Sequence, residues 1–180
     1  MGWRVLVAIS AGLLFVSGCT SSPYESGYSY FPQPATVDVR RVGSNQPSPL
    51  TVLVTVLGVR RADPKHDIPY SVAIRMRFEN IGQARITFDP HTVELVTGTL
   101  RPFPPPVVEP PQPFESAPGQ RRDLLAYFPF PPGAKASQIN LQNLRLRWEV
   151  KIDGVPVSQT ALFDRVERGD YPEPDPDIAY

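Results

Sequence analysis

Cysteine and histidine, the side chains that most often ligate metals or act as nucleophile and base, are scarce in this chain. Its 180 residues include one cysteine, Cys19, and two histidines, His66 and His91. A single cysteine excludes an intramolecular disulfide and a thiolate metal cluster, and two histidines leave little for a transition-metal site. Both histidines stand in turn-like stretches, so we expect them on exposed loops. The sequence predicts no metal or other cofactor.

Enzyme motifs give no stronger indication of catalysis. The sequence lacks G-x-S-x-G, H-E-x-x-H and a glycine-rich phosphate loop. Distant carboxylates could still converge in the fold as a glycosidase pair, although no spacing argues for one. Glu173, Asp175 and Asp177 alternate with prolines, but the glycine turn and terminal glutamate of a calcium loop are missing, so we expect a disordered acidic tail. The chain is therefore predicted not to be an enzyme.

The surroundings of Cys19 indicate a different chemistry, which is export followed by lipid attachment. Arg4 and the free amine form a short positive region, and residues 5–16 carry no charge. As a helix these 12 residues span about 18 Å, well short of a hydrocarbon core of about 30 Å. A cleaved secretory signal fits this length better than a membrane span.

The segment that follows, Val16-Ser17-Gly18-Cys19, resembles the lipobox of bacterial lipoproteins. The resemblance implies transfer of a diacylglyceryl group to the Cys19 sulfur, cleavage before Cys19 and acylation of the new amine. Two or more acyl chains hold a protein stably on a membrane. Thr20 and Ser21, with no aspartate, resemble the signal for sorting to the outer membrane. We therefore expect a lipid-anchored envelope protein at the outer membrane, facing the periplasm.

Composition and the segment around Cys19 divide the sequence into four parts. The 18 basic and 18 acidic side chains balance, which disfavours a nucleic-acid partner. The 23 prolines exceed average usage, while the apolar fraction is that of a globular protein. We predict a signal peptide over 1–18, a flexible tether over 19–34, a β-domain over 35–166 and a proline-rich acidic tail over 167–180.

Alternating apolar and polar residues predict strands throughout the β-domain. The clearest run is Leu144 to Ile152, and Tyr70 to Glu79 alternates in the same way. Asp153-Gly154 predicts a type I′ hairpin turn. About seven or eight strands and no helix favour an antiparallel two-sheet sandwich. With Trp148 on a buried strand, the domain is similar to immunoglobulin-like sandwiches of secreted bacterial lipoproteins.

A long proline-rich loop is the first candidate for a partner-binding site. The stretch from Arg101 to Gly119 places Phe103, Pro104, Pro105, Pro106 and Phe114 close together in sequence. Proline limits φ and favours a semi-rigid polyproline II conformation, which suits a binding arm. The alternative is a cover over an open sheet edge, with the two phenylalanines as anchors.

Four arginines form the second candidate, a face for anionic ligands. Arg75, Arg77, Arg145 and Arg147 lie on the polar sides of two predicted strands. On neighbouring strands of one sheet they would form a cationic patch for lipopolysaccharide phosphates, peptidoglycan carboxylates or an acidic partner. The alternative is an ordinary solvated sheet face.

The function predicted from these features is that of a non-catalytic accessory or assembly protein. It is anchored in the cell envelope by lipid on Cys19 and acts through contacts with an envelope protein partner. The alternative is a binding module for envelope glycan or lipopolysaccharide that uses the arginines. A hydrolase with an unrecognised site is the least favoured reading.

Overall fold

The computed structural model describes residues 23–25, 27–41, 43, 47–66, 68–134 and 138–167. The lipobox with Cys19 and the acidic tail beyond Glu167 lie outside these residues. The described chain is all-β, with two short 3-10 turns, η1 (Pro64–His66) and η2 (Pro90–Thr92).

The described residues form eleven strands. In chain order they are β1 (Tyr28–Phe31), β2 (Ala35–Val39), β3 (Leu50–Arg60), β4 (Ser71–Asn80), β5 (Ile86–Phe88), β6 (Glu94–Thr97), β7 (Val107–Glu109), β8 (Phe114–Ser116), β9 (Arg121–Pro129), β10 (Asn143–Ile152) and β11 (Val155–Glu167).

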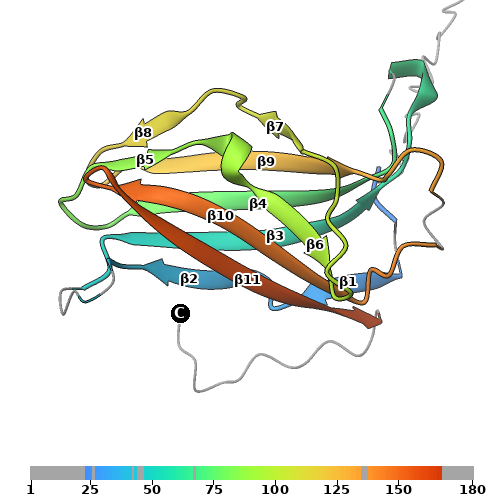
Figure 1. Ribbon diagram of the computed structural model, residues 1–180, viewed down its shortest axis with the longest axis horizontal. Coiled ribbons are helices and arrows are strands. Elements are labelled where there is room, and N and C mark those ends of the chain that lie inside the picture. Colours follow the sequence, from blue (N-terminus) through green and yellow to red (C-terminus); the bar gives the residue numbers. More distant parts are fainter. Residues whose placement is uncertain are drawn as a thin grey trace, which may run out of the picture.

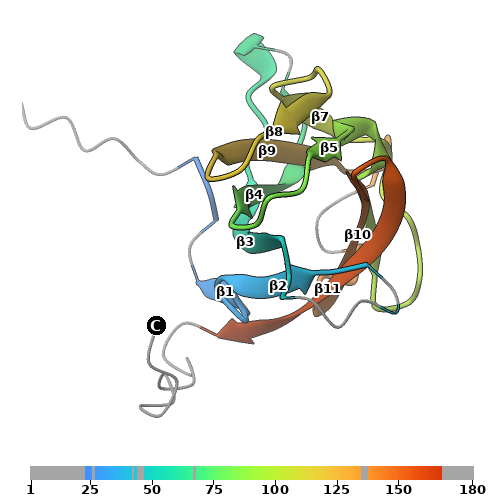
Figure 2. The same ribbon diagram turned by 90° about the vertical axis from the view of Figure 1, so that its left-hand side faces the viewer.

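These strands form two antiparallel sheets that pack face to face, as the end-on view in Figure 2 shows. The β10 sheet has the order β1-β11-β10-β5-β8, and β6 pairs with β10 beside β5. The β4 sheet has the order β2-β3-β4-β9-β7. The predicted all-β sandwich is confirmed, while the immunoglobulin-like assignment stays a prediction.

Alternation along most of each central strand places the core between the sheets. In β4, Ile74, Met76 and Phe78 are buried, and in β10 Leu146 and Trp148 are buried. Successive side chains of a strand point to opposite faces, so one face of each strand is apolar. Each fully buried large apolar side chain stabilises the fold by about 1.5 to 3 kcal/mol.

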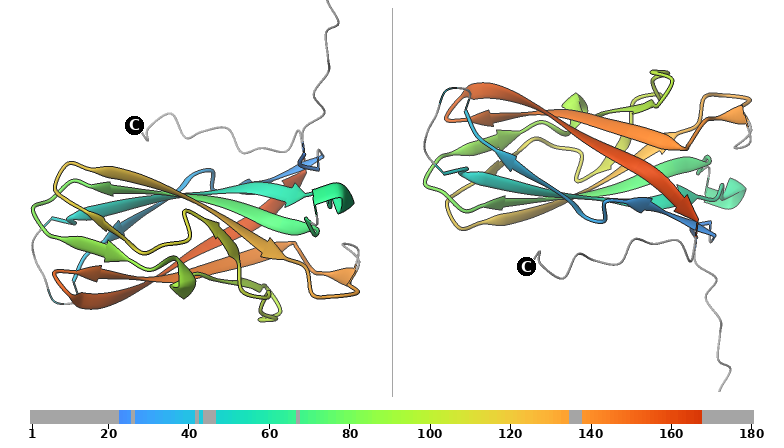
Figure 3. Two further views of the ribbon diagram at one scale, coloured as in Figure 1. Left: turned by 90° about the horizontal axis from the view of Figure 1, so that it is seen from above. Right: turned by 90° about the horizontal axis from the view of Figure 1, so that it is seen from below.

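Each long side of the sandwich is closed by a segment that passes from one sheet to the other. Along one side, β1 pairs with β11 and the following strand β2 pairs with β3. Along the opposite side, β7 pairs with β9 and β8 pairs with β5. Figures 1 and 3 show these pairs of short strands on the two sides. Prolines stand in both connections, as expected at sheet edges, where a missing N–H does not interrupt a ladder.

The predicted strand count is too low because three strands are very short. Strand β1 lies in the stretch expected to be a flexible tether, and β7 and β8 lie in the expected proline-rich loop. None has more than four residues, which is too few for a clear alternation. Each is held by backbone pairing to a strand distant in sequence.

The tether prediction over 19–34 is wrong for two stretches of these residues. Residues 28–31 pair with β11, and Tyr24 forms an isolated bridge with Arg60 at the end of β3. The chain therefore joins the sandwich well before residue 35.

The hairpin prediction is confirmed at the junction of β10 and β11. Asp153 and Gly154 have φ angles of 48° and 83°, as a type I′ turn requires. Ile152 and Val155 pair across the turn.

The loops gather at two ends of the sandwich, which are named here by a residue of each. The Phe130 end comprises the described residues 61–66, 68–70, 98–106, 130–134 and 138–142, on the right in Figure 1. The Asp153 end comprises the described residues 40–41, 43, 47–49, 81–85, 117–120 and 153–154, on the left in Figure 1.

Candidate functional site

The proline-rich segment forms one wall of the sandwich. The Phe103 ring lies 6.1 Å from the Phe130 ring, and its N–H donates to the Leu95 carbonyl (2.9 Å). The Phe114 ring lies 5.4 Å from the rings of both Phe78 and Phe88. These contacts agree with the alternative interpretation of the segment, a cover over an open sheet edge with the two phenylalanines as anchors.

The prolines between these anchors lie at the surface. Pro104 and Pro106 are half-buried and Pro105 is exposed. With Phe103 they line a shallow cleft of about 240 Å³. A role of this segment in binding a partner stays a prediction.

The four arginines do not form one face. Arg75 and Arg77 belong to β4, whereas Arg145 and Arg147 belong to β10, so the two pairs lie in different sheets. Their side chains alternate with core residues and therefore point away from the core, on opposite outer faces of the sandwich. The predicted single cationic patch is wrong, because strand neighbourhood depends on pairing that local sequence does not encode.

Charge on the outer face of the β4 sheet is partly balanced by acids on neighbouring strands. The Arg77 Nε donates to the Asp123 carboxylate of β9 at 3.0 Å. Arg121 lies 3.8 Å from the same residue and 4.0 Å from Glu79. The outer face of the β4 sheet therefore resembles an ordinary solvated sheet face, which was the alternative to an anion-binding patch.

The Asp153 end contains a cleft of about 600 Å³ bounded by three turns. Arg40, Arg41, Pro49, Ile81 and Gln83 line it together with Asp153. Its lining therefore combines two arginines, one aspartate and apolar side chains.

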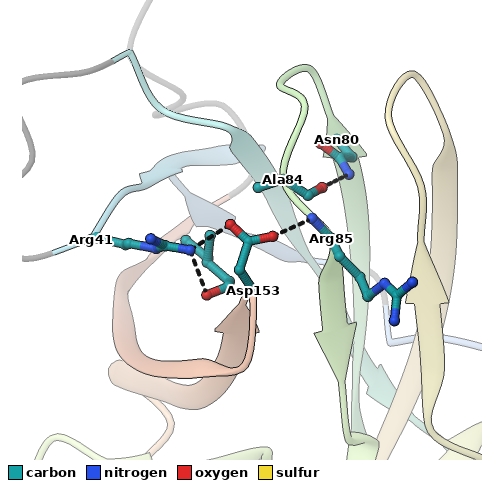
Figure 4. Close-up of polar contacts among 6 residues, drawn as sticks. Arg41, Asn80, Ala84, Arg85 and Asp153 are labelled. Carbon is teal, nitrogen blue, oxygen red and sulfur yellow. Dashed lines mark hydrogen bonds and ion pairs between the residues drawn. The ribbon is translucent and has the colours of Figure 1, made fainter.

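A polar network organises this cleft (Figure 4). The Asp153 carboxylate forms an ion pair with Arg41 and accepts a hydrogen bond from the Arg85 N–H at 2.8 Å. The Arg41 guanidinium also donates to the Ile152 carbonyl at 3.1 Å. The hairpin turn is thereby joined to the chain after β2 and to the start of β5.

Asn80 supports the same end from inside the protein. Its side-chain amide donates to the carbonyls of Ala84 and Ser116, both at 2.8 Å, and the residue is 1% exposed. The amide thus connects the β4–β5 turn with β8. The sequence signalled only a turn here, because an asparagine at a strand end does not reveal its distant partner.

The Phe130 end contains a second cleft, of about 500 Å³. It is lined by Thr97, Thr99, Arg101, Phe103 and Ile139, among others. Its Phe103 ring lies 6.1 Å from the Phe130 ring, which lies at the same distance from the Tyr70 ring.

Two tyrosines of β1 are held in an environment that disfavours their ionised form. Burial raises the pKa of Tyr28 to about 12, and the Glu25 carboxylate, 3.1 Å from its hydroxyl, acts in the same direction. The Arg165 guanidinium, 3.7 Å from the ring centre, opposes this shift. Burial also raises the pKa of Tyr30, whose hydroxyl donates to the Leu141 carbonyl at 3.1 Å.

Three observations concern the described part of the chain only. Its His, Cys, Asp and Glu side chains form no group of three that could hold a metal ion. Its helical turns include none long and apolar enough to cross a membrane. His91 is exposed on η2, as expected, whereas the lipidation candidate Cys19 lies outside the described residues.

Comparison with known proteins adds one weak likeness. No protein-family model matches the chain, and no curated protein matches it. The crystal structure of the yjhA protein from Bacillus subtilis is 16% identical, over 54% of this chain and 71% of that one, with a TM-score of 0.33. The structure itself defines the class, an all-β protein with two packed antiparallel sheets.

Proposed function

We propose that this chain is a lipid-anchored, non-catalytic protein of the bacterial cell envelope that acts by binding another envelope protein, as an accessory or assembly component. The observation that carries the proposal is the lipobox ending at Cys19, followed by an all-β domain. The outer membrane, facing the periplasm, is the proposed location, because no aspartate follows the cysteine.

The cleft at the Asp153 end is the proposed contact site. Arg40 is exposed at its rim, and Arg41 is oriented by Asp153 and the Ile152 carbonyl. Arginine pairs with carboxylates in a planar, two-bond geometry that gives both strength and direction. The exposed Ile81 adds apolar surface beside these cations. An extended partner segment with an acidic side chain matches this combination.

Lipid attachment is tested first by comparing the native precursor with its Cys19→Ala variant in cells. We expect the native protein in the membrane fraction with a mass increase from acyl chains on Cys19. The variant should lack that mass increase. A native protein without lipid would contradict the proposal.

Partner binding is tested with a photo-crosslinking amino acid at position 81. Position 162 is the control, since Leu162 is also exposed but lies on the outer face of β11. We expect a discrete protein adduct at 81 that is weak or missing at 162. Equal adducts at both positions would contradict the assignment of the cleft.

A charge-reversal variant then tests whether the crosslinked adduct at position 81 depends on the cleft. Arg40→Glu should reduce the adduct at position 81 and weaken binding of the purified partner. Arg147→Glu, at an exposed arginine of β10, is the matched control and should leave both unchanged. Equal losses in the two variants would indicate a general charge effect in place of a specific site.

A further inference from the structure

The chain enters the sandwich at the Phe130 end. The Pro23 carbonyl accepts a hydrogen bond from the Arg61 N–H, and the Glu25 N–H donates to the Val59 carbonyl, both at 2.9 Å. Arg60 and Arg61 stand where β3 leaves the β4 sheet towards η1. The first described residues are therefore fastened to this end by backbone pairing.

The chain between Cys19 and this attachment is very short. Pro23 follows Cys19 by four residues. Four residues span at most about 14 Å even when fully extended. Strand β10 alone has ten residues and is about 33 Å long. A lipid on Cys19 would therefore hold the Phe130 end near the membrane surface, with the Asp153 end a full strand length away.

The exposed side chains of the Phe130 end suit a lipid surface. Tyr70 and Leu100 are exposed large apolar residues. Arg61, Lys65 and Arg101 are exposed cations on the same set of loops. Tyrosine is enriched at the level of lipid headgroups, and cations near an anionic bilayer are attracted to its phosphates.

The turn that contains Leu100 holds this side chain exposed to solvent. Leu100 has φ of 61°, a left-handed conformation that is unfavourable for a bulky residue. The turn is held by hydrogen bonds from the Leu100 N–H to the Thr97 carbonyl (2.9 Å) and from the Gly98 N–H to the Asn143 carbonyl (2.7 Å). A strained backbone thus presents an exposed leucine beside Arg101.

We propose that the Phe130 end is the membrane-contacting face of this protein. Leu100 and Tyr70 lie among the lipid headgroups, and Arg61, Lys65 and Arg101 face lipid phosphates. The cleft at the Asp153 end then points away from the bilayer, towards a partner about 30 Å above the surface, roughly one β10 length away. This inference rests on the proposed lipid attachment at Cys19.

The two ends offer a matched pair of positions for a direct test. Leu100 is 61% exposed and Ile81 is 65% exposed, at opposite ends of the sandwich. Because lipid occupies the native cysteine, Leu100→Cys and Ile81→Cys each provide a unique thiol for an environment-sensitive fluorophore. The lipidated full-length variants are inserted into vesicles of phosphatidylethanolamine and phosphatidylglycerol that carry a nitroxide quencher in the headgroup.

We expect quenching several-fold stronger at position 100 than at position 81. Equal quenching, or stronger quenching at position 81, would overturn the inference. A second pair, Lys65→Cys and Val155→Cys, gives the same comparison on exposed residues of the two ends if the turn at 100 does not tolerate substitution.

The mass of the purified protein separates this inference from the proposed function. A protein without acyl chains on Cys19 would contradict lipid attachment itself, whatever the fluorophores report. An acylated, vesicle-bound protein with equal quenching at both ends would contradict only the membrane-contacting face.

Discussion

The Phe130 end and the Asp153 end close the same two sheets with different interactions. At the Phe130 end, the rings of Tyr70 and Phe103 both pack on the ring of Phe130. At the Asp153 end, directional hydrogen bonds of Asn80 and Asp153 join three turns. Apolar packing tolerates small shifts, whereas an unpaired buried polar group costs its full desolvation energy. The Asp153 end should therefore lose most stability where its buried polar group, Asn80, is removed.

The largest effect is expected from Asn80→Ala. The substitution leaves the carbonyls of Ala84 and Ser116 without their amide donor, so the free energy of unfolding should fall by about 3 kcal/mol. Urea unfolding followed by circular dichroism measures this loss. Gln142→Ala, at an exposed amide side chain of the Phe130 end, is the control and should change stability little. Similar losses for both variants would remove the contrast between the ends.

A smaller effect is expected when the two anchors of the proline-rich segment are compared. Phe114 contacts two buried rings and Phe103 contacts one. Since both are half-buried, Phe114→Ala should lower the free energy of unfolding by about 2 to 3 kcal/mol and Phe103→Ala by about 1 to 2 kcal/mol. The same urea titration compares the two variants. A larger loss for Phe103→Ala than for Phe114→Ala would show that the Phe130 end depends more strongly on its anchor, Phe103.

The hairpin turn should lose about 1 to 2 kcal/mol on Asp153→Ala. Alanine tolerates the positive φ of 48° less well and cannot accept the Arg85 N–H. Asp153→Asn keeps both properties and loses only the exposed ion pair with Arg41, so it should cost well under about 1 kcal/mol. Thermal unfolding of both variants separates the contribution of the turn geometry from that of the charge. Equal losses of stability in the two variants would assign the effect to the ion pair with Arg41.

The smallest expected effect is a pH dependence in the alkaline range that comes from β1. Tyr28 has a pKa of about 12 in the folded state, above its ordinary value of about 10. The unfolded state therefore loses this proton first, so the stabilisation is complete below pH 10 and falls as the pH rises towards 12. In urea unfolding at pH 9 and pH 11, Tyr28→Phe should lose less stability than the native protein. Tyr70→Phe, at an exposed ring, should behave like the native protein.

Several elements of the fold were predictable because their signals are local. Alternation of side chains along residues 144–152 requires one face of the strand to be buried, and that strand is β10. The Asp153-Gly154 turn follows from the backbone preferences of two adjacent residues. The segment Val16-Ser17-Gly18-Cys19 also depends only on neighbouring residues for its resemblance to a lipobox.

The candidate sites were less predictable because they depend on which distant segments meet. Arg41 and Asp153 are separated by 112 residues, yet they form one network with Arg85. Neither a spacing nor a motif in the sequence connects them. The cleft beside them exists only because three turns arrive at the same end of the sandwich.

The sequence by itself determined the all-β class, the hairpin and the candidate lipid site, since these depend on neighbouring residues. The tertiary structure decided that the two arginine pairs lie in different sheets and that the proline-rich segment is a wall. It also decided that the chain joins the sandwich at residue 23, four residues after Cys19. Strand pairing is a long-range choice of backbone partners, and the backbone N–H and C=O groups are the same at every residue except proline, so local sequence leaves most of that choice open.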